Sequence, residues 1–321
     1  MCKYKILVTA TNFSMLCKEA KAFLISEGCE IIENPFGRPM TYEERKDLMG
    51  DIDAVITGPD VWDQRLFEIS PKLKCIARFG VGVDNIDLDG ARTCGIKVFN
   101  AAGQNSDSVS EHTMALILAC VREIPHLNII TRRDTWERCI FHELRDLTVG
   151  LLGFGGIARL VAEKLRPFHP RIIAYDKYPN YEIAEKLGVQ MCSFEEVMSK
   201  SDVISLHLPS LPDTVHIIND ESLSLVKKGA ILINTARGTV VDEGALYRAL
   251  TNGTLSWAGL DVYEKEPVSP ENPLMKLSNV ICTPHAAAES YEVYRDVAIF
   301  CAHGVISVLN GNDPVNWLNK A

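Results

Sequence analysis

The chain of 321 residues lacks the features that mark several classes of protein. It has no apolar run near the 18 or more residues of a membrane span, no low-complexity tract and no internal repeat. Its ten cysteines never form a CxxC pair, which argues against a disulfide framework and a metal site. The chain also has fewer basic than acidic residues, with 33 Lys and Arg against 42 Asp and Glu. The net charge of −9 argues against a nucleic-acid or anionic-membrane partner.

The N-terminus has no signal-peptide layout, because residues 1–8 run straight into a strand-like segment. Scattered cysteines without pairing motifs are typical of reduced thiols in the cytosol. We therefore expect a cytoplasmic protein with no membrane partner. The length suffices for two domains, each with its own core.

Strand-like apolar runs alternate with helical patterns throughout the chain, which predicts an α/β fold with parallel sheets. The expected strands of a first sheet are residues 5–9, 54–57, 73–77 and 97–99, and those of a second sheet are 147–152, 171–175, 202–206, 230–234, 257–261 and 279–282. Helical patterns include 17–27, 42–49, a long helix that starts at the capping box Ser108-Val-Ser-Glu111, and 291–309.

We expect the last predicted helix, residues 291–309, to pack against the first domain. That domain is therefore expected to be discontinuous in sequence. We expect a substrate domain of residues 1–99 plus 289–321 and a nucleotide-binding domain of residues 100–288. Both are predicted to be doubly wound parallel sheets, Rossmann-like or flavodoxin-like.

The glycine motif of the second domain reads Gly150-Leu-Leu-Gly153-Phe-Gly155-Gly-Ile-Ala158. It follows a predicted strand and leads into a helical pattern, and a second strand ends at Asp176, 23 residues after Gly153. This is the dinucleotide-binding fingerprint in its required context. Gly153 permits the tight turn, Gly155 lets the pyrophosphate approach, and Ala158 is small enough for helix–strand packing.

Asp176 favours NAD over NADP as the cofactor. Its carboxylate can accept hydrogen bonds from the adenosine ribose hydroxyls, whereas a 2′-phosphate would meet like charge. That repulsion is roughly 4 kcal/mol per unit charge at 4 Å with an effective dielectric of 20. Lys177 next to it weakens the preference, because it can turn toward a phosphate.

Three further motifs carry candidate catalytic residues, and they read Asn234-Thr-Ala-Arg237-Gly, Leu260-Asp-Val-Tyr-Glu-Lys-Glu266-Pro and Thr283-Pro-His285-Ala. Arginine can bind a carboxylate with a planar fork of donors. Histidine exchanges a proton near neutral pH, and a buried glutamate can hold the imidazole in one tautomer. These groups suit the oxidation of a hydroxyl next to a carboxylate.

Taken in order along the chain, these motifs resemble the D-2-hydroxyacid dehydrogenase family, most closely its D-3-phosphoglycerate-dehydrogenase-like branch. The resemblance covers nearly the whole chain and includes segments 78–87, 105–111, 201–209 and 313–319. It implies that His285 is the general acid/base, Glu266 its partner and Arg237 the carboxylate clamp. It also implies substrate contacts from Arg78, Val81, Gly82 and Asn105.

The same resemblance implies a set of NAD contacts and no metal. Beside the fingerprint residues Gly153 and Gly155, Gly156 and Ile157 would contact the pyrophosphate, and Asp176 would anchor the adenosine ribose. Leu208, Pro209 and Thr214 would form the loop beside the cofactor, and Thr235, Ala236 and Asp261 would lie at the nicotinamide. The sequence leaves structural roles open for Asp261, Thr214 and His207. We expect His112 and His126 to be packing or surface residues, and Trp136 to be either core or part of an inter-domain or inter-subunit arm.

Some positions depart from the family's pattern. Gly156 replaces a polar or arginine residue, Ala102 a proline and Ala287 a glycine. Segment 57–62 offers no positive charge before Arg65, although phosphoglycerate enzymes often place basic residues there.

The best expectation is a D-3-phosphoglycerate-dehydrogenase-like enzyme. A glycerate/hydroxypyruvate or glyoxylate reductase and an NAD(H)-sensing corepressor-type binding protein are the alternatives. In each case the ligand is a small 2-hydroxy or 2-keto acid or NAD itself. A homodimer built largely from the cofactor domain is the expected assembly.

Overall fold

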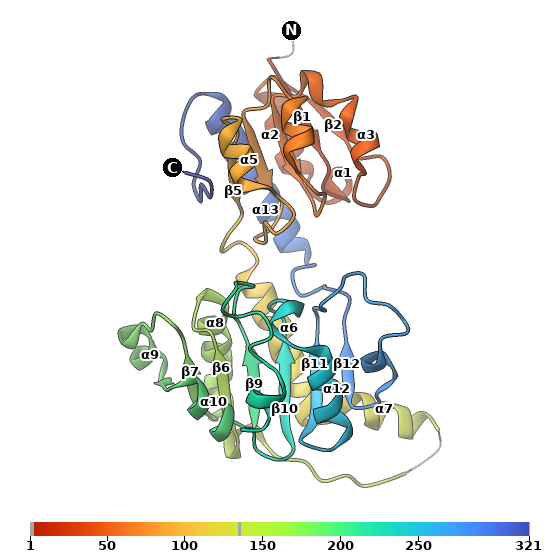
Figure 1. Ribbon diagram of the computed structural model, residues 1–321, viewed down its shortest axis with the longest axis vertical. Coiled ribbons are helices and arrows are strands. Elements are labelled where there is room, and N and C mark those ends of the chain that lie inside the picture. Colours follow the sequence, from red (N-terminus) through yellow and green to blue (C-terminus); the bar gives the residue numbers. More distant parts are fainter. Residues whose placement is uncertain (1–2, 134–135, 321) are drawn as a thin grey trace. The chain divides into compact units, whose positions relative to one another are not determined.

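The computed structural model describes residues 3–133 and 136–320 and divides the chain into two compact units (Figure 1). Unit 1 comprises Met1–Asn105 and Glu289–Ala321, and unit 2 comprises Ser106–Ala288. The first unit is therefore discontinuous. The chain passes from unit 1 to unit 2 after Asn105, whereas the sequence suggested residue 99. The segment after the last strand of unit 1 is still hydrogen-bonded to that unit, because the Ala101 amide donates to the Gly80 carbonyl.

Unit 1 contains a parallel sheet of five strands in the order β2-β1-β3-β4-β5. The strands are β1 (Tyr4–Val8), β2 (Cys29–Glu33), β3 (Ala54–Thr57), β4 (Cys75–Arg78) and β5 (Lys97–Asn100). This is the flavodoxin-like order, whose topological switch point lies between the first and third strands. The sequence missed β2, because this edge strand carries Glu30 and Glu33 and buries only Cys29 fully.

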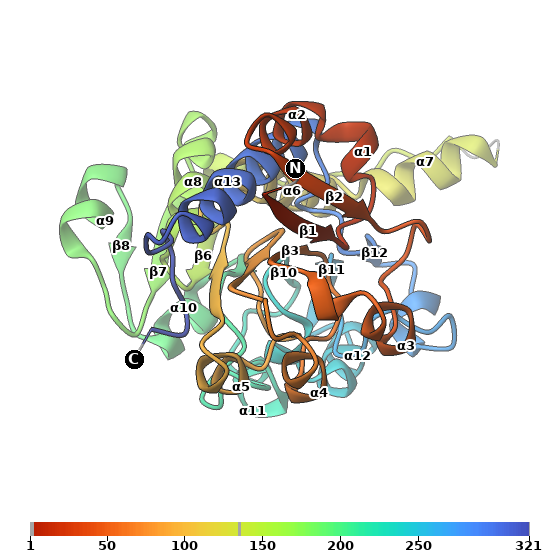
Figure 2. The same cartoon turned by 90° about the horizontal axis from the view of Figure 1, so that it is seen from above.

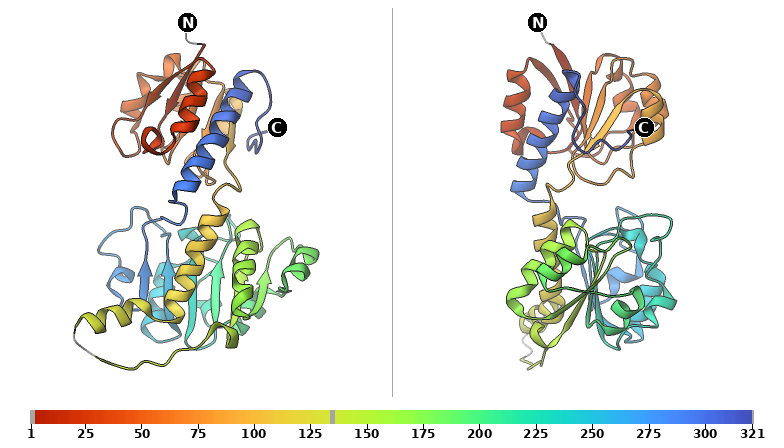
Figure 3. Two further views of the ribbon diagram at one scale, coloured as in Figure 1. Left: turned by 180° about the vertical axis from the view of Figure 1, so that it is seen from behind. Right: turned by 90° about the vertical axis from the view of Figure 1, so that its left-hand side faces the viewer.

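Helices cover both faces of this sheet (Figures 2 and 3). One face carries α1 (Phe13–Leu16), α2 (Lys18–Ser26) and α13 (Tyr291–Leu309), and the other carries α3 (Tyr42–Lys46), η1 (Met49–Asp51), α4 (Gln64–Glu68) and α5 (Leu88–Thr93). The predicted helix 291–309 is confirmed. It packs against α2, β3 and β4, because Val297, Cys301 and Val305 recur at helical spacing and are fully buried.

Unit 2 contains a parallel sheet of seven strands in the order β12-β11-β10-β9-β6-β7-β8. The strands are β6 (Thr148–Leu152), β7 (Arg171–Tyr175), β8 (Gln190–Met191), β9 (Val203–Leu206), β10 (Ala230–Asn234), β11 (Leu255–Leu260) and β12 (Val280–Cys282). Six were predicted, and the two-residue β8 was missed. The order is that of a Rossmann fold with one added strand, and its switch point lies between β6 and β9.

Two apolar cores hold the helices of unit 2 on opposite faces of the sheet. One core joins Ile117, Val149 and Val161 and includes residues of α6 (Ser106–Val121), α8 (Gly156–Leu165) and α9 (Tyr181–Leu187). The other includes residues of α10 (Phe194–Lys200), α11 (Asp220–Leu223) and α12 (Glu243–Thr251). The remaining elements are α7 (Ile124–Arg132), η2 (Leu144–Asp146), η3 (Arg166–Phe168), η4 (Gly238–Val240) and η5 (Pro273–Lys276).

The predicted start of the long helix is wrong. The α6 helix begins at Ser106, so Ser108 lies inside it and does not cap it. The Ser108 hydroxyl donates instead to the Ala287 carbonyl at 2.8 Å. The local sequence around Ser108 does not distinguish a serine that caps a helix from one inside its first turn. The hydrogen bond to the Ala287 carbonyl, which is distant in sequence, shows that Ser108 is not the cap.

Within residues 3–133 and 136–320, no single helix has the length and apolar content of a membrane crossing. Only α6 and α7 taken together pass that test, and the chain bends by 57° between them. The same residues contain no group of three or more His, Cys, Asp or Glu side chains arranged to bind a metal ion.

Candidate active site

The chain at the end of β6, where the glycine turn begins, is hydrogen-bonded to the ends of β7 and β9, the two strands on either side of β6. Gly153 has a φ of 92°, and its amide donates to the Tyr175 carbonyl at 2.8 Å. The His207 amide donates to the Leu152 carbonyl at 2.7 Å. A Cβ atom on Gly153 would lie 2.6 Å from the backbone oxygen of His207. Glycine is therefore required here by both conformation and space.

The N-terminus of α8 faces open space. Gly155 is the N-cap residue, and a Cβ atom there would meet nothing within 4 Å. A Cβ atom on Gly156 would meet only the Ser106 hydroxyl, at 4.0 Å. The first amides of this ten-residue helix can thus reach a pyrophosphate. Ile157 follows in the first turn, and Ala158 is fully buried.

The Asp176 carboxylate, just after β7, is fixed by two backbone amides. It accepts hydrogen bonds from Phe154 at 2.7 Å and from Tyr178 at 2.8 Å. The Lys177 ammonium pairs with Asp213, so it already has an anionic partner. A hollow borders this carboxylate and is lined by Tyr175, Asp176, Pro179, Tyr181, Met191, Cys192, Ser193 and Glu196. The residues present therefore fit a nucleoside with free ribose hydroxyls.

The loop after β9 is held together by Thr214. Its hydroxyl donates to the Pro209 carbonyl at 2.6 Å and accepts from the Leu211 amide at 2.8 Å. Leu208 is buried and Pro209 is exposed. The structure gives the Thr214 side chain a role within its own loop, and its predicted cofactor contact stays a prediction.

Residues at the end of β10 position the backbone of Arg237. The Asn234 side chain donates to the Arg237 carbonyl at 2.9 Å and accepts from the Ala236 amide at 3.0 Å. The Thr235 hydroxyl lies 2.8 Å from that of Thr113 on α6. The partly buried Arg237 guanidinium donates to the Ala236 carbonyl at 2.7 Å.

Gly238 brings the Arg237 segment into backbone contact with the segment that carries Glu266. A Cβ atom on Gly238 would lie 1.8 Å from the carbonyl carbon of Tyr263. No side chain fits there without separating the two segments. The Tyr263 amide in turn donates to Glu266 Oε1 at 3.0 Å.

His285 Nδ1 lies 2.7 Å from Glu266 Oε2. The hydrogen bond to Glu266 raises the pKa of His285 above its ordinary value, against desolvation and the positive charge of Arg237. Burial alone would raise the pKa of Glu266, but hydrogen bonds from His285 and from the Tyr263 amide outweigh it, and that pKa is lowered. The Glu266 side chain is 36% exposed, so it is less buried than the sequence led us to expect. The pair favours a charged imidazolium.

The buried carboxylate of Asp261 fixes the loop that carries His285. It accepts from the Thr283 hydroxyl at 2.6 Å and from the amides of Ala286 and Ala287 at 2.8 and 2.9 Å. The Asp261 carbonyl accepts from the His285 amide at 2.8 Å. His285 has a φ of 53°, a left-handed conformation that this loop maintains. The predicted contact of Asp261 with nicotinamide stays a prediction.

His112 belongs to this arrangement, although the sequence indicated a packing or surface residue. Its Nε2 lies 3.0 Å from the Thr283 hydroxyl and 3.6 Å from Asp261 Oδ1. No local signal reveals this role, because His112 and Thr283 are 171 positions apart. His207 instead contacts the Ser205 hydroxyl at 3.0 Å, and desolvation lowers its pKa to about 4. His207 is therefore a neutral, packed residue at neutral pH.

The substrate contacts expected on unit 1 follow β4. The Arg78 guanidinium donates to the Gly82 carbonyl at 2.8 Å and also to the carbonyls of Thr57 and Phe79, so it organises this loop. Asn100 donates to the Val81 carbonyl at 2.7 Å. Within residues 3–133 and 136–320, the amides of Val81 and Gly82 donate to no acceptor, which leaves them available to a carboxylate. Asn105, the last residue of this part of unit 1, is partly buried.

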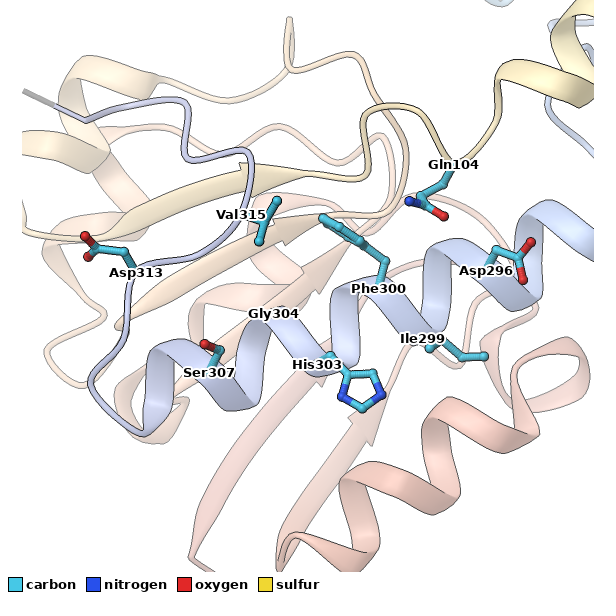
Figure 4. Close-up of a pocket in the computed structure, with 9 residues that line it drawn as sticks. All are labelled: Gln104, Asp296, Ile299, Phe300, His303, Gly304, Ser307, Asp313 and Val315. Atoms are coloured by element: carbon cyan, nitrogen blue, oxygen red, sulfur yellow. The ribbon is translucent and has the colours of Figure 1, made fainter.

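A hollow on unit 1 contains none of the predicted site residues. It lies along α13 and the C-terminal segment and is lined by Gln104, Asp296, Ile299, Phe300, His303, Gly304, Ser307, Asp313 and Val315 (Figure 4). The predicted substrate contacts of unit 1 therefore lie outside this hollow.

Comparison with known proteins shows which family the chain resembles. The family model described as "D-isomer specific 2-hydroxyacid dehydrogenase, NAD binding domain" matches residues 114–287. The chain is 40% identical over 310 residues to a D-3-phosphoglycerate dehydrogenase of Archaeoglobus fulgidus, covering 95% of this chain and 58% of that protein. It is 36% identical over 277 residues to a glyoxylate reductase of Korarchaeum cryptofilum, covering 84% of this chain and 83% of that protein.

The chain thus spans little more than half the length of the A. fulgidus relative. Among solved structures, the TT0316 protein from Thermus thermophilus matches with a TM-score of 0.89 and 33% identity over 98% of this chain and 99% of that one. The order of the motifs, the two parallel sheets and these matches together place the chain in the D-2-hydroxyacid dehydrogenase family, with residues 114–287 in its NAD-binding domain.

Proposed function

We propose that this protein is an NAD-dependent dehydrogenase that interconverts a small D-2-hydroxy acid and its 2-keto acid. The observation that carries the proposal is the 2.7 Å hydrogen bond between His285 and Glu266, close enough to Arg237 for its charge to act on the imidazole. An acid-stabilised imidazole beside a guanidinium suits proton exchange at an oxygen next to a carboxylate.

NAD fits the glycine turn and the carboxylate of unit 2. The α8 amides at Gly156 and Ile157 would hold the pyrophosphate and Asp176 the ribose. When bound, NAD supplies the acceptor or donor of the hydride. Leu208, Pro209 and Thr214 would border it on one side, and Thr235, Ala236 and Asp261 at the nicotinamide end.

His285 exchanges the proton that accompanies the reaction. Because Nδ1 is bonded to Glu266, Nε2 is the atom that meets the substrate oxygen. In reduction the imidazolium donates a proton to the keto oxygen, and in oxidation the neutral imidazole accepts it from the hydroxyl. Arg237 binds the carboxylate and polarises this oxygen. For unit 1, taken by itself, we propose the amides of Val81 and Gly82 as carboxylate donors. Glu266 stabilises the charged form of His285.

We further propose a cytoplasmic homodimer built through α7 and the segment that follows it. In the described part of the chain, α7 (labelled in Figure 1) buries none of its residues. Four large apolar side chains are exposed on α7 and on the segment that follows it: Ile124 at 52%, Ile129 at 41%, Trp136 at 87% and Ile140 at 97%. Exposed apolar groups of this kind are typical of protein interfaces. A second copy of the chain would cover them.

Replacing His285 tests the proposed reaction. We expect His285→Gln to lower kcat by about 10²-fold or more, since it removes the group that exchanges the proton. Loss of NADH absorbance with a panel of 2-keto acids measures turnover, and NADH fluorescence measures binding, which should persist. His169→Gln in the turn after α8 is the matched control. Undiminished turnover in the His285 variant would contradict the assignment.

Replacing Glu266 tests the cause of the raised His285 pKa. In Glu266→Gln that pKa should fall toward or below its ordinary value, because the carboxylate that raises it is gone. Reduction requires the imidazolium, so the alkaline decline of kcat/KM should move to lower pH. Oxidation requires neutral imidazole, so its rise with pH should also move to lower pH. A pH profile in both directions measures this.

The control for this pH profile is Glu264→Gln, two residues away. Glu264 pairs with His216 at 2.8 Å rather than with His285. Its variant should keep the wild-type profile. Equal shifts in both variants would show that the effect is not specific to Glu266.

Replacing Asp176 tests the cofactor preference. Asp176→Ser should weaken NAD binding far more than NADP binding, because it removes both a ribose acceptor and a charge that repels a 2′-phosphate. Fluorescence titration with each reduced cofactor measures the ratio. Glu182→Gln on α9 removes an exposed charge as a control. An equal loss for both cofactors would show that Asp176 is not the selector.

A charge placed on α7 tests the homodimer. Ile129→Asp should increase the monomer fraction, since the interface would have to bury an unpaired carboxylate. Sedimentation equilibrium measures this, with Ile25→Asp, at a 56% exposed site on α2, as the control. A wild-type chain that sediments as a monomer would rule out the proposed assembly.

A further inference from the structure

Helix α6 contacts both ends of the loop that carries His285. The Ser108 hydroxyl donates to the Ala287 carbonyl at 2.8 Å, and His112 Nε2 lies 3.0 Å from the Thr283 hydroxyl. Ser108 and His112 are four positions apart and therefore share one face of the helix. All of these residues belong to unit 2. The loop is thus held by side chains of α6 as well as by its own hydrogen bonds.

The same helix also contacts the segment that carries Arg237. The Thr113 hydroxyl lies 2.8 Å from that of Thr235, which is two residues before Arg237. Neighbouring positions of one helix therefore reach the segments of both proposed catalytic groups, the guanidinium and the imidazole.

The direction of the hydrogen bond between His112 and Thr283 follows from the other partners of the hydroxyl. A threonine hydroxyl has one proton to donate. Thr283 Oγ1 lies 2.6 Å from Asp261 Oδ1 and 3.4 Å from the Leu260 carbonyl, so the proton goes to the nearer, carboxylate oxygen. The hydroxyl oxygen can then only accept from His112. The ring must therefore carry its proton on Nε2, which determines the tautomer of the neutral imidazole.

His112 reaches a buried carboxylate through this hydroxyl. Its Nε2 is 3.6 Å from Asp261 Oδ1, which is too long for a hydrogen bond. The Asp261 side chain is 1% exposed and also accepts from the amides of Ala286 and Ala287. His112, Thr283 and Asp261 therefore form one continuous chain of hydrogen bonds that ends in the backbone of the loop.

Packing alone does not account for the position of His112. The apolar contacts that attach α6 to its core come from other residues, such as Leu116, Ile117 and Cys120, which are buried. The His112 side chain is 24% exposed. What His112 adds at this position is a hydrogen-bond donor directed at Thr283.

Resting on the function proposed above, we propose that His112 is a positioning residue for the reaction of His285. As the Nε2–H tautomer it donates to Thr283, and together with Ser108 it keeps the loop of His285 in one position on α6. It acts through Thr283 and Asp261 and exchanges no proton itself. Without this bond the loop spends less time in the reactive geometry, and turnover falls because small displacements of a positioned group reduce the rate.

The tautomer of His112 tests the hydrogen bond without any substrate or cofactor. A long-range nitrogen–proton spectrum of the full chain with isotope-labelled histidine distinguishes the two neutral tautomers, and the His112→Gln variant identifies the signals of His112. We expect the Nε2–H form at a pH where the ring is neutral. The Nδ1–H form would overturn the proposal, whatever the activity of the enzyme.

Two substitutions separate the hydrogen bond from packing. Leucine and glutamine are both good helix formers of similar size, but only glutamine keeps a donor near the position of Nε2. We expect His112→Leu to lower kcat about fivefold, the loss that corresponds to one hydrogen bond of ordinary strength, and His112→Gln to retain most of the wild-type kcat. Equal kcat values for the two variants would show that the donor has no role.

A double-mutant cycle tests whether His112 acts through Thr283. In a Thr283→Val background, His112→Leu should change kcat by less than about twofold, since the acceptor has already been removed. In a Thr283→Ser background, which keeps the hydroxyl, His112→Leu should have its full effect. The full loss in the valine background would contradict the role of Thr283 and overturn the proposal.

The wild-type chain separates failure of this proposal from failure of the proposed function. If the wild type reduces no 2-keto acid, the dehydrogenase function and the positioning role both fail. If the wild type is active and His112→Leu is equally active, only the positioning role fails.

Discussion

The buried carboxylate of Asp261 is the constraint on which the geometry of the active site depends. Burying an ionised carboxylate is costly unless hydrogen bonds compensate for lost water. Here one hydroxyl and two amides supply them, and hydrogen bonds to a charged group contribute about 1.5–3 kcal/mol each. Those donors all belong to residues 283–287. The cost of burying the charge is therefore offset only when the loop that carries His285 takes one conformation.

A second constraint joins the arginine and the acid–base pair. Gly238 and Tyr263 are in backbone contact, and the Tyr263 amide binds Glu266, which binds His285. Arg237 is adjacent in sequence to Gly238, so its backbone and the histidine's partner are held by one chain of contacts. Catalysis by positioned groups requires such rigidity, because small displacements reduce the rate strongly. The elements behind these loops are β10 and β11, which pair in parallel.

In both units, the residues with chemical roles lie at the carboxyl edge of a parallel sheet. In unit 2 that edge carries the glycine turn, the carboxylate of Asp176 and the side chains of Arg237, Glu266 and His285, whose catalytic roles are proposed. In unit 1 it offers the amides of Val81 and Gly82, which have no acceptor among the described residues. Under the proposed function, the edge of unit 2 serves the nucleotide and proton exchange, and the edge of unit 1 offers donors to a small acid.

Much of this followed from the sequence because the relevant signals are local. The glycine fingerprint is contiguous, ten of the twelve strands among the described residues coincide with apolar runs that predicted them, and α13 has a regular apolar period. The two strands that were missed are an edge strand with two glutamates and a strand of two residues, which carry little periodic signal. The order of the motifs along the chain was sufficient to indicate the family, and it predicts Arg237, Glu266 and His285 as the catalytic residues.

Only the tertiary structure decided what surrounds those residues. His112 joins the catalytic loop through a partner 171 positions away, Arg78 turns to its own backbone, and Ser108 bonds to Ala287 rather than capping a helix. The partner of a polar side chain is set by which strands pair and in what register, and a linear pattern does not contain that information. The sequence thus determined which chemistry is present, and the fold determined which groups remain available to a ligand.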